Sequence, residues 1–77
     1  MEIKEFIENF ANQFEDTDAS VFTPETNFRE LDEWSSLLAL ATLGMIDDEY
    51  DVQLKADEMR KASTVQELFD IVKDLKD

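Results

Sequence analysis

The sequence contains neither cysteine nor histidine, and it has only one glycine and one proline in 77 residues. Without cysteine, the chain has no disulfide, no thiolate metal ligand and no thiol nucleophile. Without histidine, it also lacks the commonest general base and the usual imidazole metal ligand. Catalysis would have to rely on clustered carboxylates such as Asp32 and Glu33, which fit a solvated acidic face better than an acid/base pair. We therefore expect a protein that is not itself an enzyme.

Basic residues are also few, because 7 Lys and Arg oppose 20 Asp and Glu and leave a net charge of −13. Such a field repels nucleic acid and anionic membranes, and it attracts partners with basic docking surfaces. The first residues lack the basic and apolar pattern of a signal peptide, and no apolar run reaches membrane-spanning length. These features predict a cytoplasmic monomer that neither binds nucleic acid nor inserts into a membrane.

The scarcity of turn residues favours helices, and apolar residues recur at helical spacing. From Ile3 to Phe14 they fall at i, i+3, i+4, i+7, i+8 and i+11, which predicts a helix over residues 2–15. A second helix is predicted over residues 36–50, where apolar side chains cover much of the circumference. The long connection between the two helices is expected to contain a short helical turn.

The last third of the chain predicts two further helices. A short helix of one or two turns is expected within "ADEMRKA", residues 56–62. Thr64 and Glu67 form a capping box that opens the last helix. The whole chain, residues 1–77, is thus predicted to be a single all-α domain. Its expected architecture is a small four-helix bundle of three longer helices and one short helix, with a long first crossover loop.

The segment "DEWSSLLAL", residues 32–40, places two adjacent hydroxyl groups at the start of the second helix. Ser35 fits the N-cap position, and Trp34 before it can pack back as a hydrophobic staple. Ser36 then occupies the first helical position, where a phosphodiester would lie in the favourable field of the helix N-terminus. Because a cap alone also explains the pair, the spacing leaves both interpretations open.

The wider pattern includes "FRELDEWSSLLAL", "IDDEYDVQL" and "ADEMRKASTVQELFDIV", and it resembles the acyl carrier protein family along the whole chain. The hallmark of that family is Asp-Ser-Leu at the start of the second helix, with a variant Trp-Asp-Ser-Leu. Trp34, Ser36 and Leu37 match the variant. Leu31 matches an upstream leucine of the family, and Ser35 replaces the Asp.

The resemblance implies that Ser36 carries 4′-phosphopantetheine, transferred from coenzyme A by a phosphopantetheinyl transferase. The thiol of this arm would hold acyl intermediates as thioesters, for fatty-acid or specialised lipid or polyketide-type biosynthesis. Ketosynthases, acyltransferases or acyl-ligase type enzymes would be the partners. Ser35 keeps the capping ability of the family's Asp but lacks the carboxylate that helps the transferase and its metal ion to recognise the site.

Fatty-acid carriers commonly have carboxylates two and five residues after the modified serine, where this chain has Leu38 and Ala41. Leu38 either packs inward or is exposed beside the arm, and the second arrangement would favour a specialised carrier. The residues expected to contact partners are Leu37, Leu38, Met45, Asp47, Asp48 and Glu49. By resemblance, the acyl chain would lie between the second and third helices. Its expected lining, for each member of which ordinary core is the alternative, is Phe28, Leu40, Leu43, Ile46, Leu54, Met59, Ala62, Leu68 and Ile71.

Three other interpretations compete with an acyl carrier. In "DDEYDVQLKADE", Asp47, Glu49, Asp51 and Glu58 occupy positions 1, 3, 5 and 12 of a calcium-binding loop. Position 6 is Val52 where the loop requires Gly, so we expect no metal site. An acidic helical interaction module without a prosthetic group, or a peptidyl or D-alanyl carrier, would share the serine pair and the helical pattern.

Overall fold

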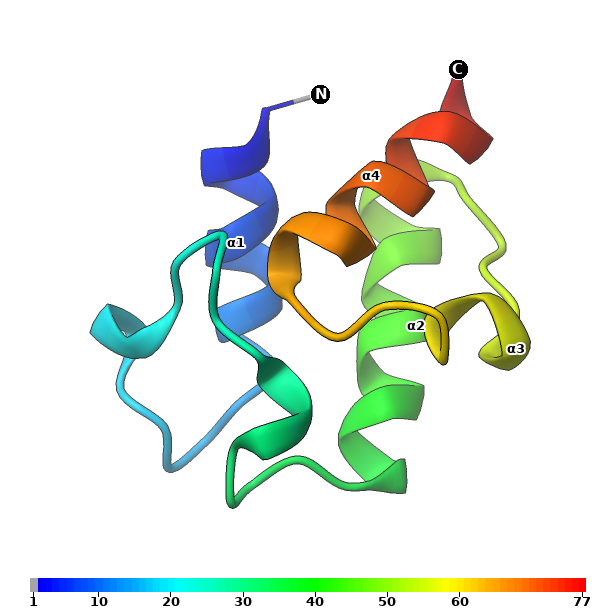
Figure 1. Cartoon of the computed structure of the whole chain (residues 1–77). Helices are drawn as coiled ribbons and strands as arrows, with labels where there is room; N and C mark the ends of the chain where they lie inside the picture. The colour runs from blue at the N-terminus through cyan, green and yellow to red at the C-terminus, as the bar shows by residue number, and fades with distance from the viewer. Residues whose placement is uncertain (1) are drawn as a thin grey trace.

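The computed structural model describes residues 2–77 and contains four α-helices (Figure 1). Their bounds are α1 (Ile3–Ala11), α2 (Ser36–Tyr50), α3 (Ala56–Met59) and α4 (Val65–Lys76). Within the described residues the only extended pairing is an isolated bridge between Asn27 and Thr64. The predicted all-α class and four-helix arrangement are confirmed. In Figure 1, α1 begins and α4 ends at one end of the molecule, whereas α2 begins at the opposite end.

The first helix is shorter than predicted. We expected it to continue to residue 15, but α1 ends at Ala11 with Asn12 as its C-cap. Beyond that point, the Gln13 amide donates to the Phe10 carbonyl at 3.1 Å and the Phe14 amide donates to the Ala11 carbonyl at 3.0 Å. These i→i+3 bonds belong to the tighter 3₁₀ geometry that often ends a helix. Phe14 lies outside the helix, but its side chain is still buried in the core.

The bounds predicted for the second helix and the start of the last are confirmed. α2 spans residues 36–50, and α4 begins directly after its N-cap, Thr64. Thr64 Oγ1 accepts from the Glu67 amide at 3.1 Å, and Glu67 Oε1 accepts from the Thr64 amide at 2.9 Å, which completes the predicted capping box. α3 is a single turn that ends at Met59, shorter than the segment 56–62 in which we expected it.

The long crossover contains two 3₁₀ turns, η1 (Ala19–Val21) and η2 (Phe28–Glu30), which confirms the predicted helical turn. Between them the chain carries Phe22 into the core, where it is 6% exposed. Such local turns satisfy backbone groups that a long loop would otherwise expose.

Five aromatic side chains tie this crossover to α1 and to the start of α2. We call them the aromatic cluster, which comprises Phe10, Phe14, Phe22, Phe28 and Trp34. Neighbouring rings in the cluster lie 4.8 to 6.2 Å apart, centroid to centroid. At this range each aromatic pair contributes about 0.5–1.5 kcal/mol beyond the burial of its area. The cluster therefore fixes a loop that has little regular structure of its own.

The other end of the core is built around Phe6. Its ring lies 5.7 Å from that of Tyr50 and 5.5 Å from that of Phe69, so it joins α1 to the end of α2 and to the first half of α4. The Tyr50 hydroxyl accepts from Asn9 Nδ2 at 3.0 Å. Burial in the core raises the pKa of the Tyr50 phenol.

None of the described helices combines the length and the apolar character needed to cross a membrane.

Glu33, near the end of the crossover, binds the start of the crossover just after α1. Its carboxylate accepts from the amides of Glu15 at 2.7 Å and Asp16 at 3.0 Å, and from Thr17 Oγ1 at 2.8 Å. These hydrogen bonds, chiefly the one from the Glu15 amide, lower the pKa of Glu33 from its ordinary value of 4.5. The folded protein therefore favours the charged form of the Glu33 carboxylate more strongly than the unfolded chain does.

We expect Glu33 to stabilise the fold at neutral pH and to lose this effect in acid. Since its folded pKa is depressed, the stabilisation is present above the unfolded pKa and disappears as the pH falls through the lower, folded value. Glu33→Gln should lower the thermal midpoint at pH 7 and leave it less dependent on pH below 4.5. Thermal melts from pH 7 down into this range measure both effects.

Glu25→Gln is the matched control, because Glu25 is an exposed carboxylate of the same crossover. In a chain with a net charge of −13, removal of an ordinary carboxylate should leave stability unchanged or raise it. An equal loss of midpoint in both variants would show that Glu33 does not act through its three hydrogen bonds.

Candidate functional site

The two adjacent serines have different roles in the structure. Ser35 has extended backbone angles, φ −156° and ψ 173°, and its Oγ accepts from the Leu38 amide at 3.3 Å. It is the N-cap of α2, as predicted. Ser36 is the first residue of the helix and is exposed to solvent. The cap therefore leaves the second hydroxyl accessible at the helix N-terminus, where an attached anion would be stabilised by the free amides.

Trp34 anchors the backbone immediately before this cap. Its ring lies 4.8 Å from the Phe28 ring and 6.2 Å from those of Phe10 and Phe14. Sequence reasoning predicted that this side chain packs back onto the helix as a hydrophobic staple; the ring contacts found in the structure are instead with the other members of the aromatic cluster. As a result, the chain enters α2 in a fixed direction and Ser36 is held at a defined place on the surface.

A cleft of about 490 Å³ opens beside the serine pair. On one side it is lined by the start of α2 and the residue before the cap. These residues are Trp34, Ser35, Ser36, Ala39, Leu40 and Leu43. Ser36 thus lies at the edge of a hollow whose α2 wall is otherwise largely apolar.

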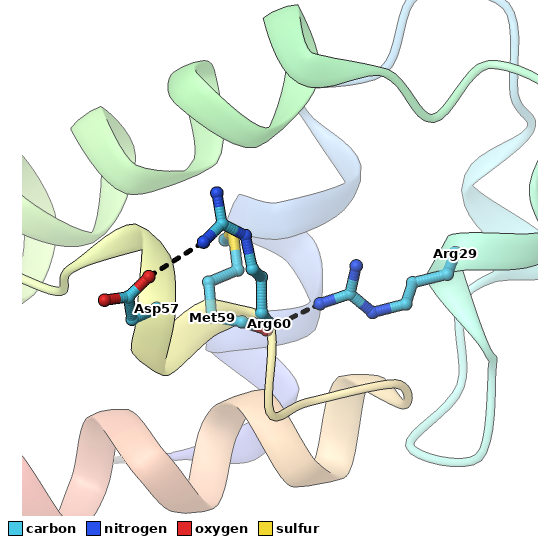
Figure 2. Close-up of polar contacts among 4 residues, drawn as sticks. All are labelled: Arg29, Asp57, Met59 and Arg60. Carbon is cyan, nitrogen blue, oxygen red and sulfur yellow. Dashed lines mark hydrogen bonds and ion pairs between the residues drawn. The ribbon is translucent and has the colours of Figure 1, made fainter.

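The opposite side of the cleft is formed by Arg29 from η2 and by Ala56, Met59 and Arg60 in and after α3. Arg29 Nε donates to the Ala62 carbonyl at 2.7 Å, and its Nη2 donates to the Met59 carbonyl at 2.8 Å (Figure 2). The Met59 carbonyl also accepts from the Ala62 amide at 3.1 Å, so Arg29 adds a second hydrogen bond at the end of α3 and one at the Ala62 carbonyl that follows it. Arg29 therefore holds this wall of the cleft in position.

Part of the predicted acyl lining is found in this cleft. Leu40, Leu43 and Met59 line it, and Leu40 is 66% exposed. The other six predicted residues are not among its lining and pack in or against the core. They are Phe28, Ile46, Leu54, Ala62, Leu68 and Ile71. For these six the structure shows the ordinary core role that sequence reasoning named as the alternative.

The residues expected to contact partners differ in exposure. Leu37 is 77% exposed, whereas Leu38 is partly buried against the core, so of its two predicted arrangements the structure shows the inward one. Met45 is 7% exposed and offers a partner almost no surface, because it faces the core from the middle of α2. Its inclusion in the partner surface was therefore wrong.

Asp47, Asp48 and Glu49 are exposed in the last turn of α2. Carboxylates at a helix C-terminus are opposed by the helix dipole, by about 0.3–1 kcal/mol each. One compensating charge comes from α4, where Lys76 Nζ donates to the Tyr50 carbonyl at 2.9 Å.

The helical conformation of residues 47–50 is incompatible with a calcium-binding loop that begins at Asp47. Residues 2–77 contain no cluster of three potential metal ligands.

Sequence reasoning did not identify the two arginines of the cleft. Arg29 and Arg60 lie far apart in the sequence and become neighbours only when η2 packs against the end of α3. A compositional signal was nevertheless present, since these are the chain's only arginines among 20 acidic residues.

In a comparison with family models, residues 5–72 match the phosphopantetheine attachment site family. Because the match covers most of the chain, the protein belongs to this family of phosphopantetheine-carrying proteins, to which acyl carrier proteins also belong. Comparisons with curated proteins and with solved structures returned no significant match.

The cofactor of this family is covalently attached 4′-phosphopantetheine. The geometry of the serine pair fits such a group, since an exposed hydroxyl stands at a capped helix N-terminus beside a largely apolar cleft. Carrier domains work with transferases and biosynthetic enzymes, and they are generally not catalysts themselves.

We expect Ser35→Ala to destabilise the protein by about 1 kcal/mol, because the Leu38 amide loses its cap. In a domain of this size, that loss lowers the thermal midpoint by about 4–8 °C. Ser35→Asp should retain the stability, since Asp caps as well as Ser does. Ser36→Ala is the control and should change stability by less than about 0.5 kcal/mol, because its side chain is exposed and forms no cap. Equal losses at both serines would contradict the assignment of Ser35 as the cap.

Proposed function

We propose that this protein is an acyl carrier that holds acyl groups as thioesters on a 4′-phosphopantetheine arm attached to Ser36, and that it serves a specialised lipid or polyketide-type pathway. The observation that supports Ser36 most strongly is the division of roles in the serine pair. Ser35 is engaged as the N-cap, whereas Ser36 is exposed at the first position of α2 and borders the cleft.

The residues around Ser36 have distinct tasks in this proposal. The thiol that holds the acyl group belongs to the cofactor, which reconciles acyl chemistry with a chain that lacks cysteine and histidine. Ser36 Oγ provides the point of attachment, and the amides at the start of α2 stabilise the negative charge of the phosphodiester. Trp34 and the Ser35 cap keep this helix start ordered, so that a transferase meets the same geometry in every molecule.

Mass spectrometry after incubation with coenzyme A and a broad-specificity phosphopantetheinyl transferase tests the attachment site. Wild-type protein and Ser35→Ala should each gain the mass of one phosphopantetheine, whereas Ser36→Ala should gain none, because it lacks the acceptor hydroxyl. Ser35→Asp, which restores the family's carboxylate, should be modified faster than the wild type.

A second candidate function is an acidic interaction module that never carries the arm, and Ser35 in place of the family's Asp is the feature that favours it. Absence of any mass gain with several transferases, for wild type and Ser35→Asp alike, would overturn the carrier proposal and leave this second function. A gain on Ser36→Ala would place the arm elsewhere. Amino-acyl cargo in place of acyl cargo would indicate a peptidyl or D-alanyl carrier.

The exposed side of α2 supports a specialised partner. We define the docking face as Leu37, Leu40, Ala41, Gly44 and Asp48, which share one side of the helix and are all exposed. Its first half is apolar and its second half is acidic, with Asp47 and Glu49 beside it. A partner with an apolar centre and a basic rim on one side would complement this surface.

This face lacks carboxylates in its first half, so we expect weak binding, with a shallow salt dependence, to a ketosynthase of primary fatty-acid synthesis. Ala41→Glu supplies a carboxylate at one of the positions where fatty-acid carriers commonly have one. It should strengthen binding by about two- to fivefold at low salt and steepen the salt dependence, as expected for one exposed ion pair. Calorimetric or fluorescence titrations at two salt concentrations measure both.

Ala19→Glu adds the same charge at an exposed position in η1, away from the docking face, and should leave binding unchanged. Strong and steeply salt-dependent binding by the wild type would count against a specialised carrier.

A further inference from the structure

The cleft beside Ser36 differs in charge from the rest of the molecule. The chain has 20 acidic residues, yet no carboxylate lines the cleft, whereas both of the chain's arginines do. Between the arginines and the serine pair, the remaining lining is apolar. The hollow therefore combines an apolar interior with positive charge in a protein whose net charge is −13.

Arg29 contributes a fixed and uncompensated charge. Its two hydrogen bonds go to the carbonyl of Ala62 and to that of Met59 (Figure 2 shows the second), and they orient the guanidinium without neutralising it. Among residues 2–77, no carboxylate forms an ion pair with Arg29. A guanidinium has five N–H donors, so two bonds leave donors for another acceptor.

The guanidinium group of Arg60 can change its ion-pair partner. Its Nη1 lies 2.7 Å from Asp57 Oδ1, and the two side chains are 72% and 85% exposed (Figure 2). Exposed ion pairs of this kind contribute little to stability, so Arg60 can exchange Asp57 for a carboxylate that enters the cleft. Two guanidinium groups would then face one anion.

We propose that the cleft selects acyl cargo that bears a carboxylate on an apolar stem. The stem would lie along Leu40, Leu43 and Met59, and the carboxylate would be bound by Arg60 and Arg29. A purely alkyl chain would displace water from the guanidinium groups without replacing its hydrogen bonds, which is unfavourable. This inference rests on the proposed function, because the cargo must be carried on Ser36.

Loading with defined cargo tests the proposal. A transferase and amide-linked coenzyme A analogues would place either an adipoyl or a hexanoyl group on the arm, and the amide prevents hydrolysis. The two groups have the same number of carbons and differ in the terminal carboxylate. The adipoyl form should unfold about 4 °C higher than the hexanoyl form, the shift typical of one modest interaction in a domain of this size. It should also shift the NMR amide signals of Ala56, Met59 and Arg60 more strongly.

Arg60→Gln should abolish the difference between the two loaded forms. Lys61→Gln is the matched control, because Lys61 is an exposed neighbour that carries the same charge but does not line the cleft. It should preserve the difference. Both variants leave Arg29 and its support of α3 in place, so neither depends on a change in the fold.

Three results would overturn the inference. Equal midpoints for the adipoyl and hexanoyl forms would show that the carboxylate is not recognised. Equal effects of Arg60→Gln and Lys61→Gln would show a general charge effect. A dependence on Arg60 of the same size in the form that carries only the bare arm would show that the phosphodiester, and not the cargo, is the bound anion. The mass of the loaded protein is read separately, so failure to load would refute the proposed function and this inference with it.

Discussion

The contact between Trp34 and the rings of the aromatic cluster is the constraint on which the geometry of the site depends. The crossover that precedes α2 is long and has only two 3₁₀ turns, so local hydrogen bonding alone would define its course poorly. Packing of Trp34 against Phe28, Phe10 and Phe14 fixes the residue immediately before the Ser35 cap. Since each pair of rings contributes about 0.5–1.5 kcal/mol, several pairs together exceed the effect of one cap. The exposed serine is thus positioned by buried aromatic contacts, although its own side chain lies in solvent.

The carboxylates of this chain occur in two different electrostatic environments. The last turn of α2 places three carboxylates where the helix dipole opposes them, and Lys76 from α4 supplies one positive charge at the same helix end. Such an arrangement lowers local stability and leaves a charged surface, which would suit the docking of a basic partner under the proposed function. The carboxylates of Glu33 and Glu67 act in the opposite sense, because each accepts backbone hydrogen bonds and stabilises the fold. Acidic residues in this chain therefore differ in their hydrogen-bond partners: some stabilise the fold, and the exposed ones at the end of α2 are those that the proposed function assigns to recognition.

The sequence predicted the parts of the structure that depend on local chemistry. Spacing of apolar residues identified α1, the capping box located the start of α4, and the serine pair located the start of α2. It could not predict which side of α2 is buried, because apolar residues surround that helix. The structure buries Thr42 and leaves Leu37 and Leu40 exposed, an outcome that depends on how α1 and the crossover pack against α2. The side of the cleft that contains Arg29 and Arg60 could not be predicted for a similar reason. The two arginines come close only because η2 packs against the end of α3.

The exposure of Leu37 and Leu40 has a physical consequence for the way a carrier of this kind works. Single exposed apolar side chains are ordinary on protein surfaces, whereas neighbouring ones that form a patch often mark a site where a partner or a ligand binds. Leu40 belongs both to the docking face and to the lining of the cleft, so a partner on this face would lie against the same side chain as cargo in the cleft. Cargo held against Leu40 would change the surface that a partner meets. A single side chain at this position can therefore make partner binding sensitive to whether the cleft is filled, without any change in the backbone of α2.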